Sequence, residues 1–363
     1  MNRRMLLGSA VSLAAMPRRL GAQNAQKVVR IGWVTAQQAS SLAPYVEAFR
    51  SGLANLGYVE GRNLVLVLRY ADDHLERVPE LVAELIRIPI DLIVAQGAAG
   101  VLNNKLVVSV PIVYAFSGDP VLAGFADSLA RPHANMTGLT FMAPELTAKR
   151  LELLREMIPD LRCVALLAYP EHPGEHIERA YSEETASRLR IGIDYFPTGK
   201  LEDLTAALAK IAADPPQAIS LLADGFALQN RDRIIGFAME HRIPVISGWP
   251  IFAESGAVCT YGPNLNESYR RLGYYVDRIL KGAKPADLPI EQPTKFELVL
   301  NLKSAKKLDI GIPQTLLARA DDRITFSRRA RGRRGRGESG RENCGCVSFP
   351  GCRGWRRAGR SRR

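Results

Sequence analysis

The chain has 363 residues, of which 47% are hydrophobic and 24% charged, and its formal net charge is +12. Such a charge suggests a nucleic-acid or membrane partner, but it is concentrated at the two ends. Residues 327–363 contain thirteen Arg against two Glu, and residues 1–26 contain four Arg. The body between them is mildly acidic, so we expect no nucleic-acid partner, and its roughly 300 residues suffice for two cores joined by a hinge.

The first 26 residues have the pattern of an export signal peptide. Arg3 and Arg4 precede the apolar stretch 5–16, and Ala22 ends a small-residue cleavage site. The apolar stretch is too short to span a bilayer. The paired arginines fit either the twin-arginine or the general secretory route. Because no Cys precedes Cys163, a lipid-anchored N-terminus is excluded, and we expect a soluble periplasmic protein.

From Val28 onward, short apolar runs alternate with helical patterns, as expected of βαβ units around parallel sheets. The first half contains predicted strands at 28–34, 64–70, 92–96 and 112–116 and predicted helices at 45–56 and 75–86. After a helix at 146–157, the second half contains predicted strands at 163–169, 191–196, 218–223 and 245–248 and helices at 181–189, 201–213 and 231–241. Later helices are predicted at 267–281 and 304–308, with an extended segment at 296–301. This pattern predicts an α/β fold of two doubly wound, Rossmann-like lobes.

Several predicted strands end in residues that suit a ligand site, because ligands of open α/β sheets bind at the carboxyl ends of the strands. The candidates are Thr35, Gln96, Gly97, Ser117, Asp119, Tyr169, Asp224 and Trp249, with Gln37 as a weaker one. Gly97 would let backbone N–H groups approach an anion. Tyr169 and Trp249 offer flat apolar surfaces for a solute, although aromatic residues also fill cores.

The two acidic candidates each have an alternative role. Asp119 either accepts hydrogen bonds from a ligand ammonium or caps the turn before Pro120. Asp224 either pairs with a ligand cation or caps a helix that begins near Leu228.

No motif indicates catalysis, so we expect neither an enzyme nor a cofactor. His172 and His176 flank Glu175, but Pro173 and Gly174 oppose the helix that a zinc site would need, and we expect a solvated loop. The chain contains no Gly-x-Ser-x-Gly elbow, phosphate-binding loop or dinucleotide glycine motif.

The cysteines and the C-terminal tail leave two questions open. Cys163 and Cys259 lie in apolar runs and are expected to be buried strand thiols; whether they form a disulfide depends on geometry. Residues 327–363 have Arg-Gly dipeptides and no periodicity, which predicts disorder. This tail is either an RNA- or lipid-binding arm or the product of a reading-frame shift near Phe326 or Ser327. Its abrupt start favours the frame shift.

A set of sequence motifs lies in the C-terminal part of the region between the signal peptide and the Arg-rich tail. It comprises Tyr261-Gly262-Pro263-Asn264, residues 283–289, residues 291–301 and residues 312–321. This signature resembles that of the ABC-transporter substrate-binding proteins related to the tryptophan/tyrosine binding proteins, a branch of the type I periplasmic-binding-protein fold. The resemblance covers roughly residues 28–324, including Asn135–Leu139 and Gly118-Asp119-Pro120-Val121. The last motif favours a ligand role for Asp119.

The resemblance implies a domain organisation with three crossings between lobes, near 138–143, 261–264 and 289–300. We expect residues 27–142 and 263–296 to form the first lobe, and residues 143–262 and 297–326 to form the second.

The resemblance also implies a function, that of a monomeric receptor that captures a small, amino-acid-like solute and delivers it to ABC permease subunits at the inner membrane. A periplasmic ligand-sensing subunit of a signalling system is the alternative.

Overall fold

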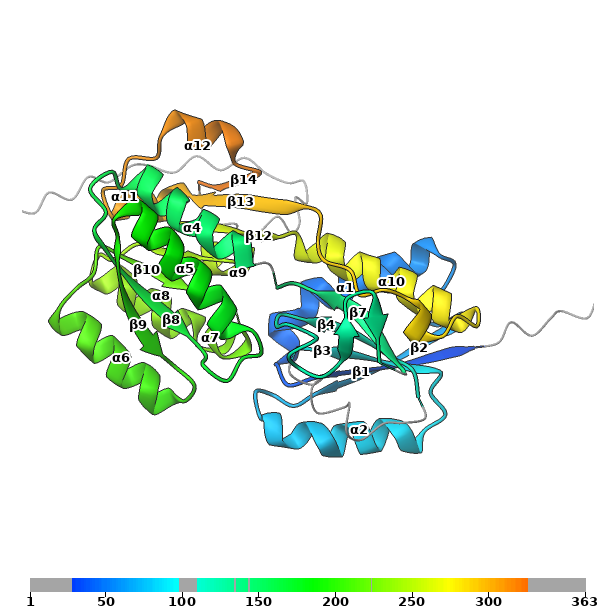
Figure 1. Ribbon diagram of the computed structural model, residues 1–363. Coiled ribbons are helices and arrows are strands. Elements are labelled where there is room, and N and C mark those ends of the chain that lie inside the picture. The colour runs from blue at the N-terminus through cyan, green and yellow to red at the C-terminus, as the bar shows by residue number, and fades with distance from the viewer. Residues whose placement is uncertain (1–27, 98–109, 134, 143, 223, 326–363) are drawn as a thin grey trace, which may run out of the picture. The chain divides into compact units, whose positions relative to one another are not determined.

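The computed structural model describes residues 28–97, 110–133, 135–142, 144–222 and 224–325 (Figure 1). Its framework consists of two open sheets. The first has the order β2-β1-β3-β4-β7, and all neighbouring strands are parallel. Its strands are β1 (Val29–Thr35), β2 (Leu64–Tyr70), β3 (Leu92–Gln96), β4 (Ile112–Phe116) and β7 (Met136–Thr140).

The second sheet has the order β14-β13-β12-β11-β10-β8-β9. Its strands are β8 (Cys163–Ala168), β9 (Gly192–Pro197), β10 (Ala218–Leu221), β11 (Val245–Ser247), β12 (Cys259–Pro263), β13 (Phe296–Asn301) and β14 (Asp322–Ile324). Only the β12–β13 pair is antiparallel among these neighbours. The order β9-β8-β10-β11-β12 repeats that of the first sheet. In each sheet the chain therefore reverses its direction of winding beside the first strand, which is the position where doubly wound sheets bind ligands.

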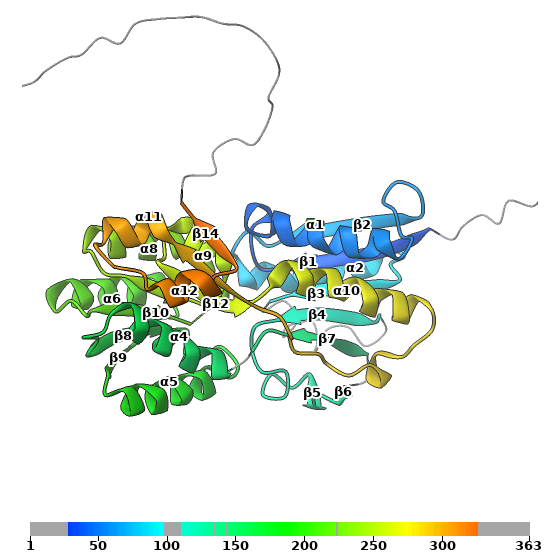
Figure 2. The ribbon, with the colours of Figure 1, turned by 90° about the horizontal axis from the view of Figure 1, so that it is seen from above.

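Helices cover both faces of the first sheet. The helix α2 (Val78–Arg87) lies on one face, and α1 (Ala39–Asn55) and α10 (Leu265–Leu280) lie side by side on the other (Figure 2). Trp33 of β1 is fully buried beneath this pair, with its ring 5.4 Å from Phe49 and 6.1 Å from Tyr269. Gly52 and Gly273 lie where the two helices touch, and the absence of side chains there permits the close approach.

The second sheet is also covered on both faces. One core cluster joins it to α4 (Pro144–Met157), α5 (Glu175–Leu189), α11 (Leu302–Lys307) and α12 (Gln314–Arg319). Another joins it to α6 (Leu201–Ala213), α7 (Gly225–Gln229), α8 (Arg231–Glu240) and α9 (Pro250–Ser255). In β8, Val164 belongs to the first of these clusters and Ala165 and Leu167 to the second, as expected for a strand buried on both sides.

Smaller elements complete the described part of the chain. They are the 3₁₀ turns η1 (Leu75–Arg77) and η2 (Pro285–Asp287) and the antiparallel pair β5 (Ala126–Ser128) and β6 (Arg131–Pro132).

The chain passes between the two sheets at three places: after β7, after β12 and before β13. The three segments are bonded to their surroundings. The Thr140 N–H donates to the Glu291 carbonyl at 3.0 Å, which joins the first segment to the third. The Arg150 Nε donates to the Tyr261 carbonyl at 2.9 Å, which anchors the second segment to α4.

Two predicted details need correction. The segment His172–His176 is not a solvated loop: Glu175 is only 4% exposed, Gly174 is buried, and α5 begins at Glu175, so that only His176 is exposed. Cys163 is only partly buried, and its thiol donates to Asp194 Oδ2 at 3.1 Å. Partial burial and this bond raise the pKa of Cys163 to about 11. Cys259 is buried, and these two cysteines form no disulfide with each other.

The predicted signal peptide and the Arg-rich tail lie outside the described residues. Within residues 28–325, apart from the gaps given above, no helix has the length and apolar character needed to cross a bilayer.

Candidate functional site

A cavity of about 400 Å³ lies at the carboxyl ends of strands from both sheets. Gln37 follows β1, Gln96 ends β3 and Gly97 follows it, and Ser117 follows β4. The second sheet contributes the residues that follow β8, β10 and β11, namely Tyr169, Gly225 and Trp249. The cavity thus occupies the winding-reversal position of both sheets, and its volume is in the range usual for small-molecule sites.

Seven aromatic side chains belong to the apolar wall, beside aliphatic residues such as Leu42 and Leu265. The aromatic ones are Tyr45, Phe116, Phe141, Tyr169, Phe226, Trp249 and Tyr269. Tyr45 and Tyr269 stack at 5.0 Å between ring centroids, and Tyr169 lies 6.3 Å from Phe226. Burial raises the pKa of Tyr45 and of Tyr269, so both phenols stay neutral at physiological pH. The wall therefore offers flat, uncharged surfaces suited to an aromatic or large apolar group.

A buried hydrogen-bond network holds the polar wall contributed by β1 and β3. The Thr35 hydroxyl donates to Gln96 Oε1 at 2.6 Å and accepts from the Gln37 N–H at 3.1 Å. The Gln96 side chain also bonds the hydroxyl of Tyr269. Gln37 is 5% exposed, and its Oε1 has no hydrogen-bond partner. This oxygen is an acceptor that a solute can satisfy.

A direct contact joins the two sides of the cavity. Ser117 Oγ lies 2.9 Å from His172 Nε2, and the Asp119 N–H donates to the Pro173 carbonyl at 2.9 Å. The His172 ring lies 6.1 Å from that of Phe116. Burial lowers the pKa of His172 to about 4, so the imidazole is neutral at pH 7. Residues from β4 and from the loop after β8 therefore meet without a charge at the contact.

Five of the eight predicted site residues line this cavity: Gln96, Gly97, Ser117, Tyr169 and Trp249. The N–H of Gly97 is already bonded to the Ala115 carbonyl at 2.8 Å, so it is not the open anion site that the sequence suggested.

The other three predicted residues do not line the cavity and have structural partners instead. Thr35 is fully buried behind Gln96. Asp119 caps its own turn, since Oδ1 accepts from the N–H groups of Val121 at 2.7 Å and Leu122 at 3.1 Å. Asp224 is 3% exposed and caps α7 by accepting from the Ala227 N–H at 2.8 Å. Burial raises the pKa of Asp224 to about 6.

Several lining residues escaped the strand-end criterion because other elements supply them. Tyr45 comes from α1 and Tyr269 from α10, while Phe141 lies in the first crossing segment. Phe226 is on α7, directly after Gly225, the first residue of that helix. His172 lines the cavity although the sequence predicts a solvated loop there. Its position shortly after the end of β8 could have identified it, because the same criterion identifies Tyr169.

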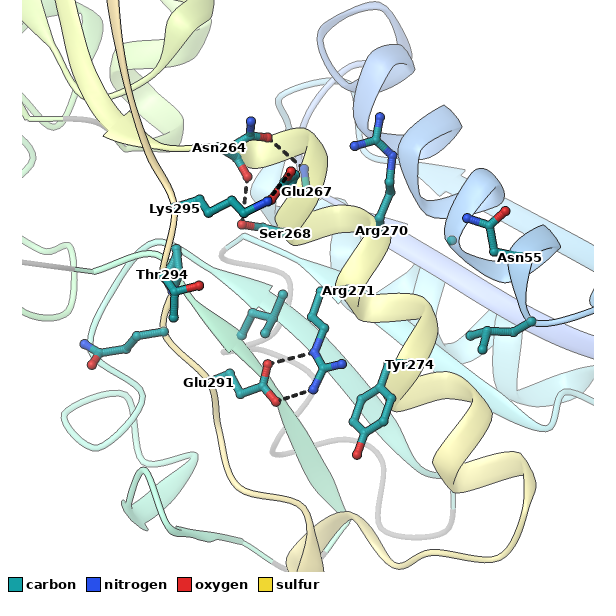
Figure 3. A pocket seen from close by; sticks show the side chains of 15 residues that line it. Asn55, Asn264, Glu267, Ser268, Arg270, Arg271, Tyr274, Glu291, Thr294 and Lys295 are labelled. Carbon is teal, nitrogen blue, oxygen red and sulfur yellow. Dashed lines mark hydrogen bonds and ion pairs between the residues drawn. The ribbon is translucent and has the colours of Figure 1, made fainter. Parts of the chain in front are cut away.

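A second cavity, of about 500 Å³, lies beside α10 and the third crossing segment (Figure 3). Ion pairs occupy it: Arg271 Nη2 lies 2.7 Å from Glu291 Oε1, and Lys295 Nζ lies 2.9 Å from Glu267 Oε1. The Arg271 guanidinium also lies 3.8 Å from the centre of the Tyr274 ring. This cavity is therefore a charged groove along the crossing segment, and its oppositely charged side chains are paired with each other.

The described residues contain no group of three His, Cys, Asp or Glu side chains placed to hold a metal ion. A family model described as ABC transporter substrate binding protein matches residues 30–324. The chain belongs to this family. Its members bind solutes and are not enzymes.

Similar proteins share the fold at low identity. The Tyrosine-binding protein of Clostridioides difficile strain R20291 is 20% identical over 291 residues, which cover 79% of this chain and 83% of that protein. The ABC domain from Streptococcus pneumonia in complex with L-Trp has a TM-score of 0.76 at 19% identity, covering 82% of this chain and all of that one. A ligand-free, open substrate-binding protein with adhesive properties from Clostridium difficile has a TM-score of 0.63 at 19% identity, covering 81% and 99%. This substrate-binding protein therefore has the type I periplasmic binding fold.

Proposed function

We propose that this substrate-binding protein is the receptor of an ABC importer and captures an amino-acid-like solute with an aromatic or large apolar side chain. The observation that carries the proposal is the cavity whose aromatic wall and polar network come from the strand ends of both sheets. The names of two similar proteins, which mention tyrosine and L-Trp, support the same solute class.

The proposed mechanism is closure around the solute. Residues 27–142 with 263–296 form one lobe, and residues 143–262 with 297–326 form the other. A solute in contact with Gln96 and Trp249 interacts with both lobes, so it stabilises the closed arrangement by its differential affinity. ABC permease subunits at the inner membrane then recognise the closed form. We place the protein in the periplasm as a monomer, after removal of residues 1–26.

Two measurements test the solute class. Mass spectrometry first identifies whatever co-purifies with the native protein, and calorimetric titration then measures the affinity for each of the standard amino acids. We expect tyrosine or tryptophan to bind best. Trp249→Ala should weaken that binding by about ten- to a hundredfold, because it removes a buried aromatic wall. The matched control is Tyr181→Ala, which removes an aromatic ring that is 39% exposed on α5, outside the cavity.

The solute class is refuted if no amino acid binds and a solute of another kind co-purifies. The importer role is tested separately, by uptake of the identified solute in cells that lack the gene. Undiminished uptake contradicts that role.

A further inference from the structure

An amino-acid-like solute carries an ammonium group, and burying this group in a cavity without an acceptor is costly. Asp119 and Asp224, the carboxylates that the sequence suggested, do not line the cavity and accept backbone N–H groups as caps. Three other carboxylates do line it, those of Asp73, Glu76 and Glu171. A charged contact with the ammonium group must therefore come from one of these three.

Asp73 lies on a turn after β2 that is bonded to the segment after β1. Its N–H donates to the Ala36 carbonyl at 2.7 Å, and its Oδ2 accepts from Gln38 Nε2 at 2.7 Å. Asp72 and Asp73 both have positive φ, 52° and 70°, a conformation that Asp adopts more readily than most residues do. Because Ala36 and Gln37 also line the cavity, these bonds fix the Asp73 carboxylate at its wall.

The second oxygen of this carboxylate is available to a solute. Oδ1 of Asp73 has no hydrogen-bond or ion-pair partner among the residues that the structure describes. The residue is partly exposed and lines the cavity, so a solute there can reach it. A carboxylate that is already held in place loses little freedom on binding, and its hydrogen bond to an ammonium group is of the strong, charge-assisted kind.

The other two lining carboxylates are less suited to this contact. The Glu76 side chain is 75% exposed and lies 3.1 Å from His74 Nδ1. Glu171 is exposed as well, and its Oε2 accepts from the Tyr169 hydroxyl at 3.2 Å. Water surrounds both of these longer side chains, and ion pairs between exposed groups contribute little free energy.

Further charges lie behind the wall of the cavity. Besides burial, the charges of Glu254 and Glu297 raise the pKa of Tyr45, and that of Arg231 lowers it. Arg231 Nε is buried without a hydrogen-bond partner in the described part of the chain. These three residues are not among the described residues that line the cavity, so they do not supply the direct contact. Charges of both signs around the cavity suit a zwitterion, which carries a carboxylate as well as an ammonium group.

We propose that Asp73 is the specificity-determining contact for the ammonium group of the solute, with Oδ1 accepting a charge-assisted hydrogen bond. The inference rests on the proposed function and adds to it the requirement for an amino group. Gln38 is a positioning residue, because it holds Oδ2 and leaves Oδ1 to the solute. The aromatic or apolar side chain of the solute lies against the wall that includes Trp249.

Calorimetric titration at pH 7 with solutes that differ only in the amino group tests the contact. The two pairs are L-tyrosine with 3-(4-hydroxyphenyl)propanoate, and L-tryptophan with indole-3-propanoate. If another amino acid binds best, it and its deaminated analogue form the pair. In the wild type, the amino acid should bind about ten- to a hundredfold more tightly than its deaminated analogue, the range expected for a hydrogen bond to a charged group.

The variant Asp73→Asn should weaken binding of the amino acid by a similar factor. The same change should leave the deaminated analogue unchanged or bind it more tightly, because it removes a negative charge that repels a carboxylate. Asn tolerates positive φ and keeps an oxygen for Gln38, so the turn is expected to survive. Thermal midpoints without solute verify that the variant is folded.

Asp72→Asn is the matched control, because Asp72 is the adjacent carboxylate, is exposed and is not among the described residues that line the cavity. It removes the same charge from the same turn, so it measures the effect of the general potential alone. We expect the amino-acid affinity to change by less than about twofold, since water and salt screen an exposed charge. Glu76→Gln and Glu171→Gln should also have less effect than Asp73→Asn.

The outcomes separate the contact from the proposed function. A deaminated analogue that binds the wild type as tightly as its amino acid overturns the inference, whatever the variants do. Equal losses in Asp73→Asn and Asp72→Asn, or a larger loss in Glu76→Gln or Glu171→Gln, overturn the assignment to Asp73 and leave the proposed function intact. If no amino acid binds the wild type and a solute of another kind co-purifies, the proposed function itself is refuted.

Discussion

The neutral imidazole of His172 leads to a pH-dependent stability that can be measured. Burial lowers the pKa of His172 to about 4, from its ordinary value of 6.5. Between these two values the unfolded chain binds a proton that the folded protein does not, so acidification favours unfolding. Each pKa unit corresponds to 1.36 kcal/mol, so the free energy of unfolding is about 3 kcal/mol lower at pH 4 than at pH 7. This loss of stability begins as the pH falls below about 6.5.

The perturbation is His172→Gln, which keeps a polar side chain at the Ser117 contact and removes the titrating group. Urea unfolding of the ligand-free protein at pH 7.5, 6.5, 5.5 and 4.5 gives the free energy of unfolding for the wild type and the variant. The difference between them should shift by up to about 3 kcal/mol against the wild type as the pH falls. His176→Gln, at an exposed position on α5, is the matched control.

Two buried carboxyl groups make the stability of the fold depend on pH in the opposite direction. Burial raises the pKa of Glu178 to about 7 and that of Asp224 to about 6. Because these groups hold protons more strongly in the folded protein, their contribution to stability is lost as the pH rises through those values. They are present in both proteins and cancel in the difference. Parallel pH profiles for the wild type and His172→Gln would refute the lowered pKa of this partly buried imidazole.

Two further predictions concern backbone packing and the turn after β4. Gly52→Ala should lower the free energy of unfolding by about 3 kcal/mol in a denaturant titration, because a Cβ at this position would lie 2.3 Å from the Arg270 carbonyl oxygen. The control Gly236→Ala lies on the exposed side of α8 with open space around it, and it should raise the free energy of unfolding by about 0.5–1 kcal/mol. Equal effects of the two changes would contradict the close contact between α1 and α10. Asp119→Ala should cost about 1 kcal/mol of stability, because it removes the acceptor of the Val121 N–H, and should leave the calorimetric affinity for the solute unchanged. A large loss of affinity instead would return Asp119 to the ligand contacts.

The sheets were predictable from sequence because most of their strands are short apolar runs, and central ones such as β3 and β4 are buried along their whole length. Predicted and observed bounds coincide for β2, β3, β4 and β13, and for the helix α6. Such runs can be recognised from their apolar composition and from the turn residues that bound them. Helix starts were less predictable. The helix α1 begins at Ala39, before the predicted start at Tyr45, and it accommodates Pro44 in its second turn. The first turns of α5 bury Glu175 and Glu178, so the apolar spacing that marks a helix is missing there.

The site was predictable only where a strand end supplies the side chain. Gln96, Ser117 and Trp249 follow buried strands, and the general rule for α/β sheets points to them. The same rule also selected Asp119 and Asp224. Sequence cannot tell a carboxylate that faces a cavity from one that accepts the N–H groups of its own turn, because both follow the same kind of strand. Tyr269 lies in the cavity because α10 returns to the first sheet, and only long-range topology determines that.

The position of α10 in the chain has a consequence for the order in which the molecule folds. The helix that covers Trp33 and Phe49 is encoded after β12, more than two hundred residues beyond β1. During synthesis, the first sheet therefore remains without one of its covering helices until most of the second has emerged. A chain interrupted before Leu265 leaves that aromatic face in water, where it is prone to aggregate. Folding of the first sheet must wait for a contact of very high sequence separation, which makes it intrinsically slow.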